Sequence, residues 1–343
     1  MTGVYSKIGL VIIGRNEGSR LEACLRSVAT KCNEAVYVDS ASTDQSVSIA
    51  RTLQFHVVEL DQNGALNAAR ARNAGFARLK QVVPGLVYVQ FLDGDCELDA
   101  AWLGNAQLWL ENHPKTVAVC GRRRECFAHQ SIYNKLCDIE WDTPVGEALS
   151  FGGEAFIRAA AFARSGGYNE TFPAGEEPDL CLRLRHTGGS IVRLPAEMSR
   201  HDAHILSFRT WWKRMVRGGY GAALVYAHWR NRSSGLDVPF RFMTRSAMLW
   251  TDGWLLGSAA CLATGIYIGG LKGMLGAGLF SLSVWLIQAL RCSLKLWGKI
   301  TAFDAFAYGI FTMLGKWPQR LGKTLLLRDI SSGVRPRKIE YKT

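Results

Sequence analysis

The chain has 343 residues, of which 48% are hydrophobic and 20% charged, and its 41 Lys and Arg against 29 Asp and Glu give a net charge of +12. This length allows one large domain or a domain with an appendage, and the apolar content excludes an intrinsically disordered chain. Nine scattered cysteines are too few for a disulfide scaffold. No CxxC pair occurs, which argues against a structural zinc site, and we expect reduced thiols in a cytosol.

The first 112 residues alternate strand-like and helix-like segments. A short apolar run at 8–13 predicts a strand, and apolar residues at i, i+4 and i+7 predict a helix over 19–29. The same patterns predict strands at 35–38, 55–60 and 86–92, and helices at 45–52, 65–79 and 99–112. This alternation predicts an α/β domain with a mainly parallel sheet and helices on both faces.

Polar clusters follow three of these strands. They are Asn16-Glu17, Asp39, and the pair Asp93 and Asp95 around a glycine. Ligands of parallel sheets bind outside the carboxyl ends of the strands, and paired carboxylates suit Mg²⁺ or Mn²⁺. An ordinary turn is the alternative, because turns are rich in Asp and Gly. Neither a GxGxxG nor a Walker-type loop is present, so metal and arginine would have to neutralise a bound nucleotide diphosphate.

A second acidic cluster consists of Glu176, Glu177 and Asp179, directly after Gly175 and at the start of a leucine-rich helical segment. Acidic residues complement the dipole of a helix N-terminus, which accounts well for one carboxylate and less well for three. Like charges this close should raise the pKa of at least one of them, which suits a general base.

The composition changes after about residue 246. Residues 246–271 carry one charge, Asp252, and residues 273–290 carry none. Each segment is long enough to cross a bilayer core of about 30 Å as a helix, and both are rich in the small residues found at helix contacts in lipid. The alternative is a pair of buried helices in a soluble core. Flanking tryptophans favour the membrane, and we predict a hairpin over about 246–271 and 273–294.

Basic residues cluster on both sides of this hairpin, whereas only Lys272 lies at its turn. The positive-inside rule then predicts that both ends are cytoplasmic. Residues 302–314 are too short to span and are expected to be interfacial or re-entrant. The start of the chain shows no signal peptide. Anionic lipid explains the basic charge, and no nucleic-acid-binding signature accompanies it.

The motifs in order resemble family 2 glycosyltransferases. They are Val11-Ile12-Ile13-Gly14-Arg15-Asn16-Glu17, Val38-Asp39-Ser40-Ala41-Ser42-Thr43-Asp44, Ala71-Arg72-Asn73-Ala74-Gly75, Phe91-Leu92-Asp93-Gly94-Asp95, Gly152-Gly153, Ser165-Gly166-Gly167-Tyr168, and Gly175 to Arg185. The resemblance covers about residues 7–230 and implies a GT-A (Rossmann-like) fold. The QxxRW motif of processive synthases is missing around residues 211–217, so a single sugar addition is expected.

The resemblance also implies roles for individual residues. Asp39, Arg72 and Asp93, with Asn16 and Glu17, are expected around the nucleotide sugar. Asp95 and Asp93 are expected to hold Mg²⁺ or Mn²⁺, with His201 as a further ligand and His204 as its competitor. Glu177 stands where the family has its catalytic Asp, and this departure leaves the choice between Glu177 and Glu176 open. Asp179 and Arg183 are expected to orient the acidic cluster.

These expectations combine into one functional prediction. Residues 1–230 would form an inverting, metal-dependent glycosyltransferase domain, residues 231–300 a basic linker and transmembrane hairpin, and residues 301–343 an interfacial segment with a basic cytoplasmic tail. The donor would be a nucleotide-diphosphate sugar, and the acceptor a hydroxyl of a lipid-linked glycan in cell-surface polysaccharide synthesis. The protein would lie in the inner membrane, with its catalytic domain in the cytoplasm. A polyprenyl-phosphate sugar transferase and a non-catalytic nucleotide-sugar binding protein are the alternatives.

Overall fold

The computed structural model describes residues 8–32, 34–232, 238 and 240–340. The chain divides into two compact units. Of the described residues, the first unit comprises 8–32, 34–128 and 137–204, and the second comprises 129–136, 205–232, 238 and 240–340. The domain boundary that we place near residue 230 from the sequence stays a prediction.

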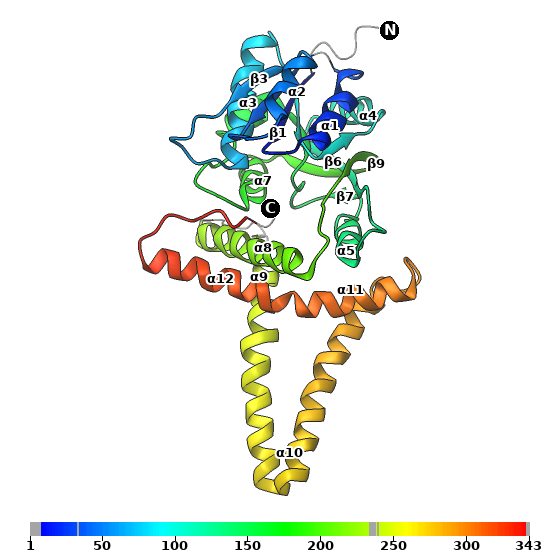
Figure 1. Ribbon diagram of the computed structural model, residues 1–343, viewed down its shortest axis with the longest axis vertical. Helices are drawn as coiled ribbons and strands as arrows, with labels where there is room; N and C mark the ends of the chain where they lie inside the picture. The colour runs from blue at the N-terminus through cyan, green and yellow to red at the C-terminus, as the bar shows by residue number, and fades with distance from the viewer. Residues whose placement is uncertain (1–7, 33, 233–237, 239, 341–343) are drawn as a thin grey trace. The chain divides into compact units, whose positions relative to one another are not determined.

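A mixed sheet forms the centre of the first unit (Figure 1). Its strand order is β3-β2-β1-β4-β8-β6-β9-β5, and β7 pairs with β9. The strands are β1 (Ile8–Gly14), β2 (Ala35–Asp39), β3 (His56–Glu59), β4 (Tyr88–Asp93), β5 (Cys96–Leu98), β6 (Thr116–Glu125), β7 (Gly146–Glu147), β8 (Ala155–Arg158) and β9 (Ser190–His201). The half from β3 to β4 is parallel, and antiparallel pairing begins where β8 joins β4. This confirms the α/β fold predicted from the sequence.

The helices that the sequence predicts after the first strands and after Gly175 are present as α1 (Ser19–Ala29), α2 (Ser46–Thr52), α3 (Ala68–Val82), α4 (Trp102–Asn112) and α7 (Glu176–His186). Two further helices, α5 (Ile132–Glu140) and α6 (Ala159–Arg164), lie in segments for which the sequence patterns predict no helix. Helix α3 packs on β1 and β2, whereas α4 packs on β6 and β9. Helix α3 begins three residues later than predicted, because the Asn67 side chain accepts a hydrogen bond from the Arg70 N–H and caps the helix.

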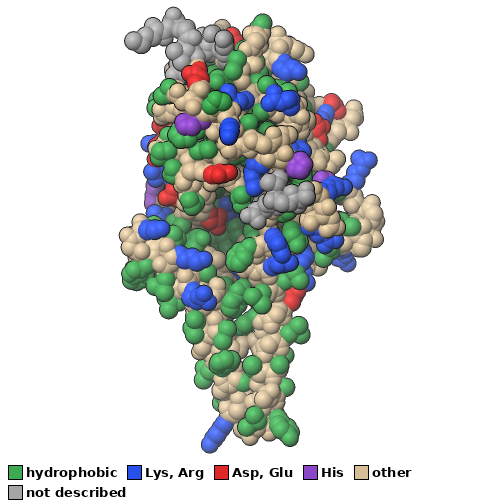
Figure 2. All heavy atoms as spheres, turned by 180° about the vertical axis from the view of Figure 1, so that it is seen from behind, with side chains coloured by type: hydrophobic (Ala, Val, Ile, Leu, Met, Phe, Trp, Pro, Cys, Tyr) green, Lys and Arg blue, Asp and Glu red, His purple; other side chains and the backbone are tan. Residues whose placement is uncertain are grey.

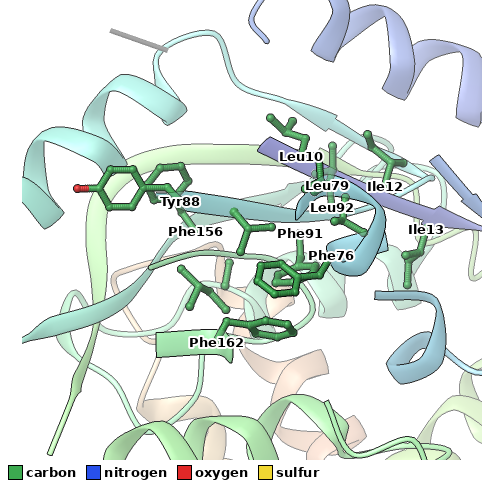
Figure 3. Close-up of a cluster of buried hydrophobic side chains, with 14 of the residues drawn as sticks. Leu10, Ile12, Ile13, Phe76, Leu79, Tyr88, Phe91, Leu92, Phe156 and Phe162 are labelled. Atoms are coloured by element: carbon green, nitrogen blue, oxygen red, sulfur yellow. The ribbon is translucent and has the colours of Figure 1, made fainter. Parts of the chain in front are cut away.

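The core of the first unit lies between the sheet and its helices (Figure 3). Strand β1 is buried from Ile8 to Ile13, as expected for a parallel strand covered on both faces. Phe162 packs its ring against Phe76 and Phe91, with centroid separations of 4.6 and 5.0 Å. This packing holds β4, which carries Phe91, against α3, which carries Phe76, and against Phe162.

The described part of the second unit is helical, with α8 (Phe208–Trp229), α9 (Arg241–Met248), a π-helical turn η1 (Leu249–Gly253), α10 (Trp254–Leu294), α11 (Ala302–Leu314) and α12 (Lys316–Ser331). Helix α12 packs along α8, and α11 packs against α10 (Figure 1). Gly322 allows the close contact between α12 and α8, because a Cβ at this position would lie 2.1 Å from the carbonyl oxygen of Val216.

Helix α10 folds back on itself at Gly270, whose φ of 56° and ψ of −135° are not helical. The two arms touch, because a Cβ at Gly265 would lie 2.4 Å from the carbonyl oxygen of Gly273, and the Trp254 indole donates to the carbonyl of Ser281 at 3.2 Å. The bend lies two residues before Lys272, where the sequence predicts the turn. In Figure 2 the arms carry hydrophobic side chains, with a basic side chain at the tip.

The segment Arg241–Leu294 is long and apolar enough to cross a membrane, and only 11% of its most apolar stretch is buried. Leu256, Tyr267 and Ile268 are more than 70% exposed. This exposure is the opposite of what a pair of buried core helices would show.

Candidate active site

The carboxyl ends of β1, β2 and β4 meet at one edge of the sheet. Gly14 pairs with Asp39, and Ile13 pairs with Asp93. Gly94 donates its N–H to the carbonyl of Ile13 at 2.8 Å, and a Cβ at this position would come within 3.0 Å of the same oxygen. Glycine therefore suits this tight turn between Asp93 and Asp95.

Arg72 connects the end of β4 with the start of α7. Its guanidinium donates to Asp93 Oδ1 at 2.9 Å and to Glu176 Oε1 at 3.0 Å, and it lies 3.5 Å from Glu177 Oε1. Arg72 is 2% exposed and its guanidinium lies 5.2 Å from the ring centroid of Tyr168. Because a buried charge is tolerated only when it is paired, this arginine holds the two predicted acidic clusters together.

Glu176 and Glu177 differ in their surroundings. Glu176 is 3% exposed and accepts from Arg72, whereas the side chain of Glu177 is 19% exposed. Burial and the adjacent Glu176 carboxylate raise the pKa of Glu177 to about 8, from an ordinary value of 4.5. Glu177 is therefore the more accessible of the two carboxylates, and it holds its proton more readily than an ordinary glutamate does.

Gly153 leaves space beside the carboxylates of Asp93 and Glu177. A Cβ at Gly153 would lie 3.1 Å from Asp93 Oδ2 and 3.7 Å from Glu177 Oε1. The two oxygens therefore face a common position that no side chain from this residue fills. The same Cβ would lie 3.3 Å from Arg123 Nη1.

The two residues that we expected to support the acidic cluster are paired within α7. Arg183 donates to Asp179 Oδ2 through Nε at 3.0 Å and through Nη2 at 2.7 Å. Its third nitrogen donates to the carbonyls of Ser165 and Gly167. Arg183 thus ties the first two turns of α7 to the segment that leads into Tyr168.

Asp95 lies at the other side of the turn, beside His201 and Cys96. His201 Nε2 lies 3.4 Å from Asp95 Oδ1, and Cys96 Sγ lies 3.5 Å from the same oxygen. Ligand atoms of all three residues lie within 4.8 Å of one another. Carboxylate and imidazole donors fit a divalent cation. Asp93, by contrast, accepts a hydrogen bond from Arg72 through one of its carboxylate oxygens.

His204, the competitor of His201, is exposed, and its backbone N–H donates to Asp202 Oδ1 at 3.1 Å. The structure brings together Asp95 and His201 of the predicted ligands, and adds Cys96. The sequence contained a signal for Cys96, because it directly follows Asp95.

The residues expected around the nucleotide hold the neighbouring loops together. Asp39 Oδ2 accepts from the Ser42 N–H at 2.7 Å, and its Oδ1 accepts from the Tyr37 hydroxyl at 2.8 Å. Asn16 Oδ1 accepts from the Thr43 N–H at 2.7 Å. Both side chains therefore shape the loop after β2.

Glu17 pairs with Arg20 at 2.9 Å. It lies next to the Asp93–Asp95 turn, since a Cβ at Gly94 would come within 3.5 Å of Glu17 Cγ. Glu17 therefore borders the same edge of the sheet.

Arg123 and Glu154 are neighbours of the site that the motifs did not identify. Arg123 Nη1 lies 3.8 Å from Glu154 Oε1, and the guanidinium lies 4.3 Å from the ring centroid of Trp141. Burial raises the pKa of Glu154. A run of three arginines at 122–124 was the signal in the sequence. Only the fold shows that Arg123 is the one that lies beside Glu154 and Trp141.

The mixed sheet with its flanking helices is of the GT-A type, and comparisons with known proteins agree. Residues 10–141 match the model of Glycosyl transferase family 2. A curated relative, the pre-mycofactocin glycosyltransferase of Mycobacterium tuberculosis, is 28% identical over an alignment of 175 residues that covers 47% of this chain and 35% of the relative. The match thus spans about a third of that protein. The similarity to glycosyl transferase family 2 therefore lies in residues 10–141.

Solved structures share the fold at low sequence identity. A mannosyltransferase from Pyrobaculum calidifontis, in complex with GDP-Man and Mn²⁺, superposes with a TM-score of 0.63 at 18% identity, over 94% of this chain and 87% of that one. Residues 1–349 of TarS from S. aureus give a TM-score of 0.51 at 14% identity, over 95% and 92% of the two chains.

Proposed function

We propose that this protein transfers a sugar from a nucleotide-diphosphate sugar to an acceptor hydroxyl, with inversion at the anomeric carbon. The contact of Arg72 with both Asp93 and the pair Glu176 and Glu177 carries the proposal. An inverting displacement needs a base on the acceptor side and charge compensation on the leaving-group side. The Arg72 contacts put candidates for both next to each other.

Glu177 is the proposed base. It removes the proton from the acceptor hydroxyl while that oxygen bonds to the anomeric carbon, and the nucleotide diphosphate leaves with the electrons of the broken bond. The greater exposure of Glu177 supports this choice, because Glu176 is buried against Arg72. General-base catalysis contributes about 10²–10⁴-fold, and alignment of the two substrates can contribute about 7–11 kcal/mol.

The metal proposal rests on Asp95, Asp93 and His201. These residues would hold Mg²⁺ or Mn²⁺, which when bound neutralises negative charge on the departing diphosphate. The proximity of Asp95 to His201 supports this, as does the GDP-Man and Mn²⁺ complex of the related mannosyltransferase. Asp39, Arg72, Asn16 and Glu17 would surround the nucleotide and sugar.

The proposed acceptor is a lipid-linked glycan in the synthesis of a cell-surface polysaccharide. The exposed apolar hairpin of α10 and the basic residues on both sides of it support a site at the cytoplasmic face of the inner membrane. An enzyme held at the same surface as its acceptor meets it at a raised local concentration. Membrane lipid is therefore a proposed partner of the second unit.

The test is sugar transfer by the full chain in detergent micelles, with Mn²⁺ and a panel of nucleotide sugars. We expect Glu177→Gln and Asp95→Ala to reduce turnover at least about 10²-fold, and Glu97→Gln to leave it unchanged. Glu97 is an exposed glutamate on β5, so its variant controls for a lost charge. Full activity of Glu177→Gln on a hydroxyl acceptor would refute the assignment.

The same assay separates the two alternatives. A polyprenyl-phosphate acceptor is already ionised and needs no base, so transfer to lipid phosphate that survives Glu177→Gln would favour that class. Donor binding without turnover on any acceptor would favour a non-catalytic binding protein.

A further inference from the structure

We propose that the second unit binds one anionic phospholipid, with an acyl chain in an apolar groove between the two arms of α10 and the phosphate at Arg320 and Lys323 of α12. This inference goes beyond the proposed function, because it gives the lipid no part in sugar transfer. It concerns residues of the helical unit alone.

The groove lies beside the π-helical turn η1 and has a volume of about 280 Å³. Its lining includes Leu249 and Trp250 of η1, Trp254 and Gly257 of the first arm, and Phe280 and Val284 of the second. Leu249 and Phe280 are 61% and 62% exposed, so the groove is open to its surroundings, which for a membrane hairpin are lipid chains. Sites that enclose a whole drug-sized molecule measure about 300–1,000 Å³. The groove therefore has room for part of one chain.

Polar contacts hold the arms at this spacing. The Ser258 hydroxyl of the first arm is hydrogen-bonded to the Ser281 hydroxyl of the second, and the Trp254 indole donates to the Ser281 carbonyl at 3.2 Å. Gly257 leaves the space between the arms open, because a Cβ there would meet nothing within 4 Å. A larger side chain at this position would compete with a lipid chain for the groove.

Tryptophans mark the depth of this end of the hairpin. Trp250 and Trp254 line the groove, and the ring of Trp254 meets that of Trp317 in α12 edge to face, with the centroids 6.4 Å apart. Tryptophan is enriched where the headgroups of a bilayer meet its chains. The groove thus runs from the headgroup level toward the bilayer core, as a phospholipid does from its phosphate to its chains.

Arg320 is held in place beside η1. Its Nε donates to Asp252 Oδ2 at 2.7 Å, and its Nη1 donates to the Thr324 hydroxyl. Asp252 directly precedes Gly253, which lines the groove. Neither bond uses Nη2, and the side chain is 27% exposed, so the guanidinium can donate to a further anion.

Lys323 lies at the same end of the groove. Its Nζ is 2.6 Å from Met248 Sδ, and Met248 directly precedes Leu249 of the groove lining. Among the carboxylates that the structure describes, none lies within ion-pair distance of this ammonium group. Lys323 is therefore available to an anion that arrives with the lipid.

Basic groups outnumber acidic groups at this end of the groove. Burial and the nearby Arg320 and Arg230 lower the pKa of Lys323, and Asp252 offsets only part of this effect. Three cations thus stand against one carboxylate. An anionic headgroup reduces this excess of positive charge, and basic pockets between membrane helices are known binding sites for such headgroups. A zwitterionic phospholipid brings its own cation and would be held less well.

The groove and the basic groups together favour a membrane phospholipid over other phosphates. A soluble phosphate uses the basic groups alone and leaves the adjoining groove without an occupant. Phospholipids surround a membrane hairpin at high concentration, so by mass action they fill a site of even modest affinity.

The test is native mass spectrometry of the full chain, delipidated in detergent micelles and titrated with dioleoyl-phosphatidylglycerol. We expect one lipid to be retained per chain, and dioleoyl-phosphatidylcholine to bind at least about fivefold more weakly. Lys323→Gln should weaken phosphatidylglycerol binding about fivefold. Gly257→Leu, which fills the groove, should weaken it at least about tenfold, because the chain loses its buried surface. Circular dichroism verifies the fold of each variant.

Arg328→Gln and Gly276→Leu are the matched controls. Arg328 is an exposed arginine of the same helix as Lys323. Gly276 belongs to the second arm and is not among the residues that line the groove, and a Cβ there also meets nothing within 4 Å. Both variants should bind phosphatidylglycerol as wild type does.

Equal affinity for the two phospholipids, or unchanged phosphatidylglycerol binding in Gly257→Leu, would overturn the proposal. Complete displacement of phosphatidylglycerol by an equal concentration of polyprenyl phosphate would show an isoprenoid site instead. Displacement by glycerol 3-phosphate would show a site for soluble phosphate, and either result counts against the phospholipid. Sugar transfer is not a readout here, so the outcome does not depend on the proposed function.

Discussion

At the scale of single residues, Arg72 has the largest predicted effect. Its planar guanidinium bonds to carboxylates on two different elements, and lysine cannot reproduce that fork. We expect Arg72→Lys to lower transfer at least about tenfold and Arg72→Met to destabilise the fold by about 3–5 kcal/mol, because buried carboxylates lose their partner. Transfer assays and urea unfolding measure the two effects.

Arg70→Lys is the matched control for this prediction. Arg70 lies on the same helix but pairs with Asp61 near the surface, where an ion pair contributes about 0–1 kcal/mol. An Arg72→Lys variant as active and as stable as Arg70→Lys would show that Arg72 does not organise the site.

Glu177 gives a pH prediction for the metal-free protein. Because its pKa is raised from 4.5 to about 8 by burial and by Glu176, the folded state binds more protons than the unfolded state between these values. Stability from this group is therefore present below about pH 4.5 and is lost as pH rises toward 8. The Glu177→Gln variant lacks this carboxyl group and therefore does not lose this stability as pH rises. The melting temperature of the variant minus that of wild type should therefore increase from pH 5 to pH 8.

The measurement is a pair of melting curves with chelator present, at each pH, with Glu97→Gln as control. A melting-temperature difference between Glu177→Gln and wild type that stays constant with pH would contradict the prediction.

At the scale of elements, the sequence predicted the first half of the sheet better than the second. Strands β1, β2 and β4 are fully or almost fully buried, and helices connect the strands of this half in chain order. Local sequence patterns are therefore enough to predict these strands. The pairings of β8 and β9 depend on segments far away in the chain. No local pattern specifies such pairing.

The candidate site shows the same division. Asp93, Asp95 and the acidic cluster stand out by composition, but Arg72 bonds to a residue 104 positions away. Cys96 meets His201 only through the register of β5 and β9. The kind of chemistry was therefore predictable, whereas the partners of each group required the fold.

Close packing between helices of the second unit gives another prediction. A Cβ at Gly322 would meet the backbone of α8 at Val216 and Tyr220, within 2.1 and 2.6 Å. Backbone cannot rotate away as a side chain can, so we expect Gly322→Ala to destabilise the unit by about 1–3 kcal/mol through overpacking. Thermal unfolding in detergent, followed by tryptophan fluorescence, measures this.

Gly218→Ala is the control, because a Cβ there meets nothing within 4 Å. An alanine inside a helix should leave stability unchanged or raise it by up to about 1 kcal/mol. Equal melting temperatures for Gly322→Ala and Gly218→Ala would show that α8 and α12 do not pack as described.

At the scale of the whole molecule, charge and apolar surface point to the same topology. At about 1.5 Å per residue, the arm from Leu271 to Leu294 is long enough for a bilayer core of about 30 Å. Basic residues gather before the first arm and after the second, and Lys272 is the one basic residue at the turn. The positive-inside rule therefore predicts that the bend lies outside and that both flanks lie in the cytoplasm.

This topology predicts how single cysteines react. The background would carry serine at Cys126 and Cys261, the two cysteines that are not buried. In intact cells, a membrane-impermeant maleimide should label Lys272→Cys at the bend and leave Arg335→Cys in the exposed tail unlabelled. In inverted vesicles the pattern should reverse. Labelling of both positions from the same side would mean that the hairpin does not cross the bilayer, and the lipid-linked acceptor would lose its main support.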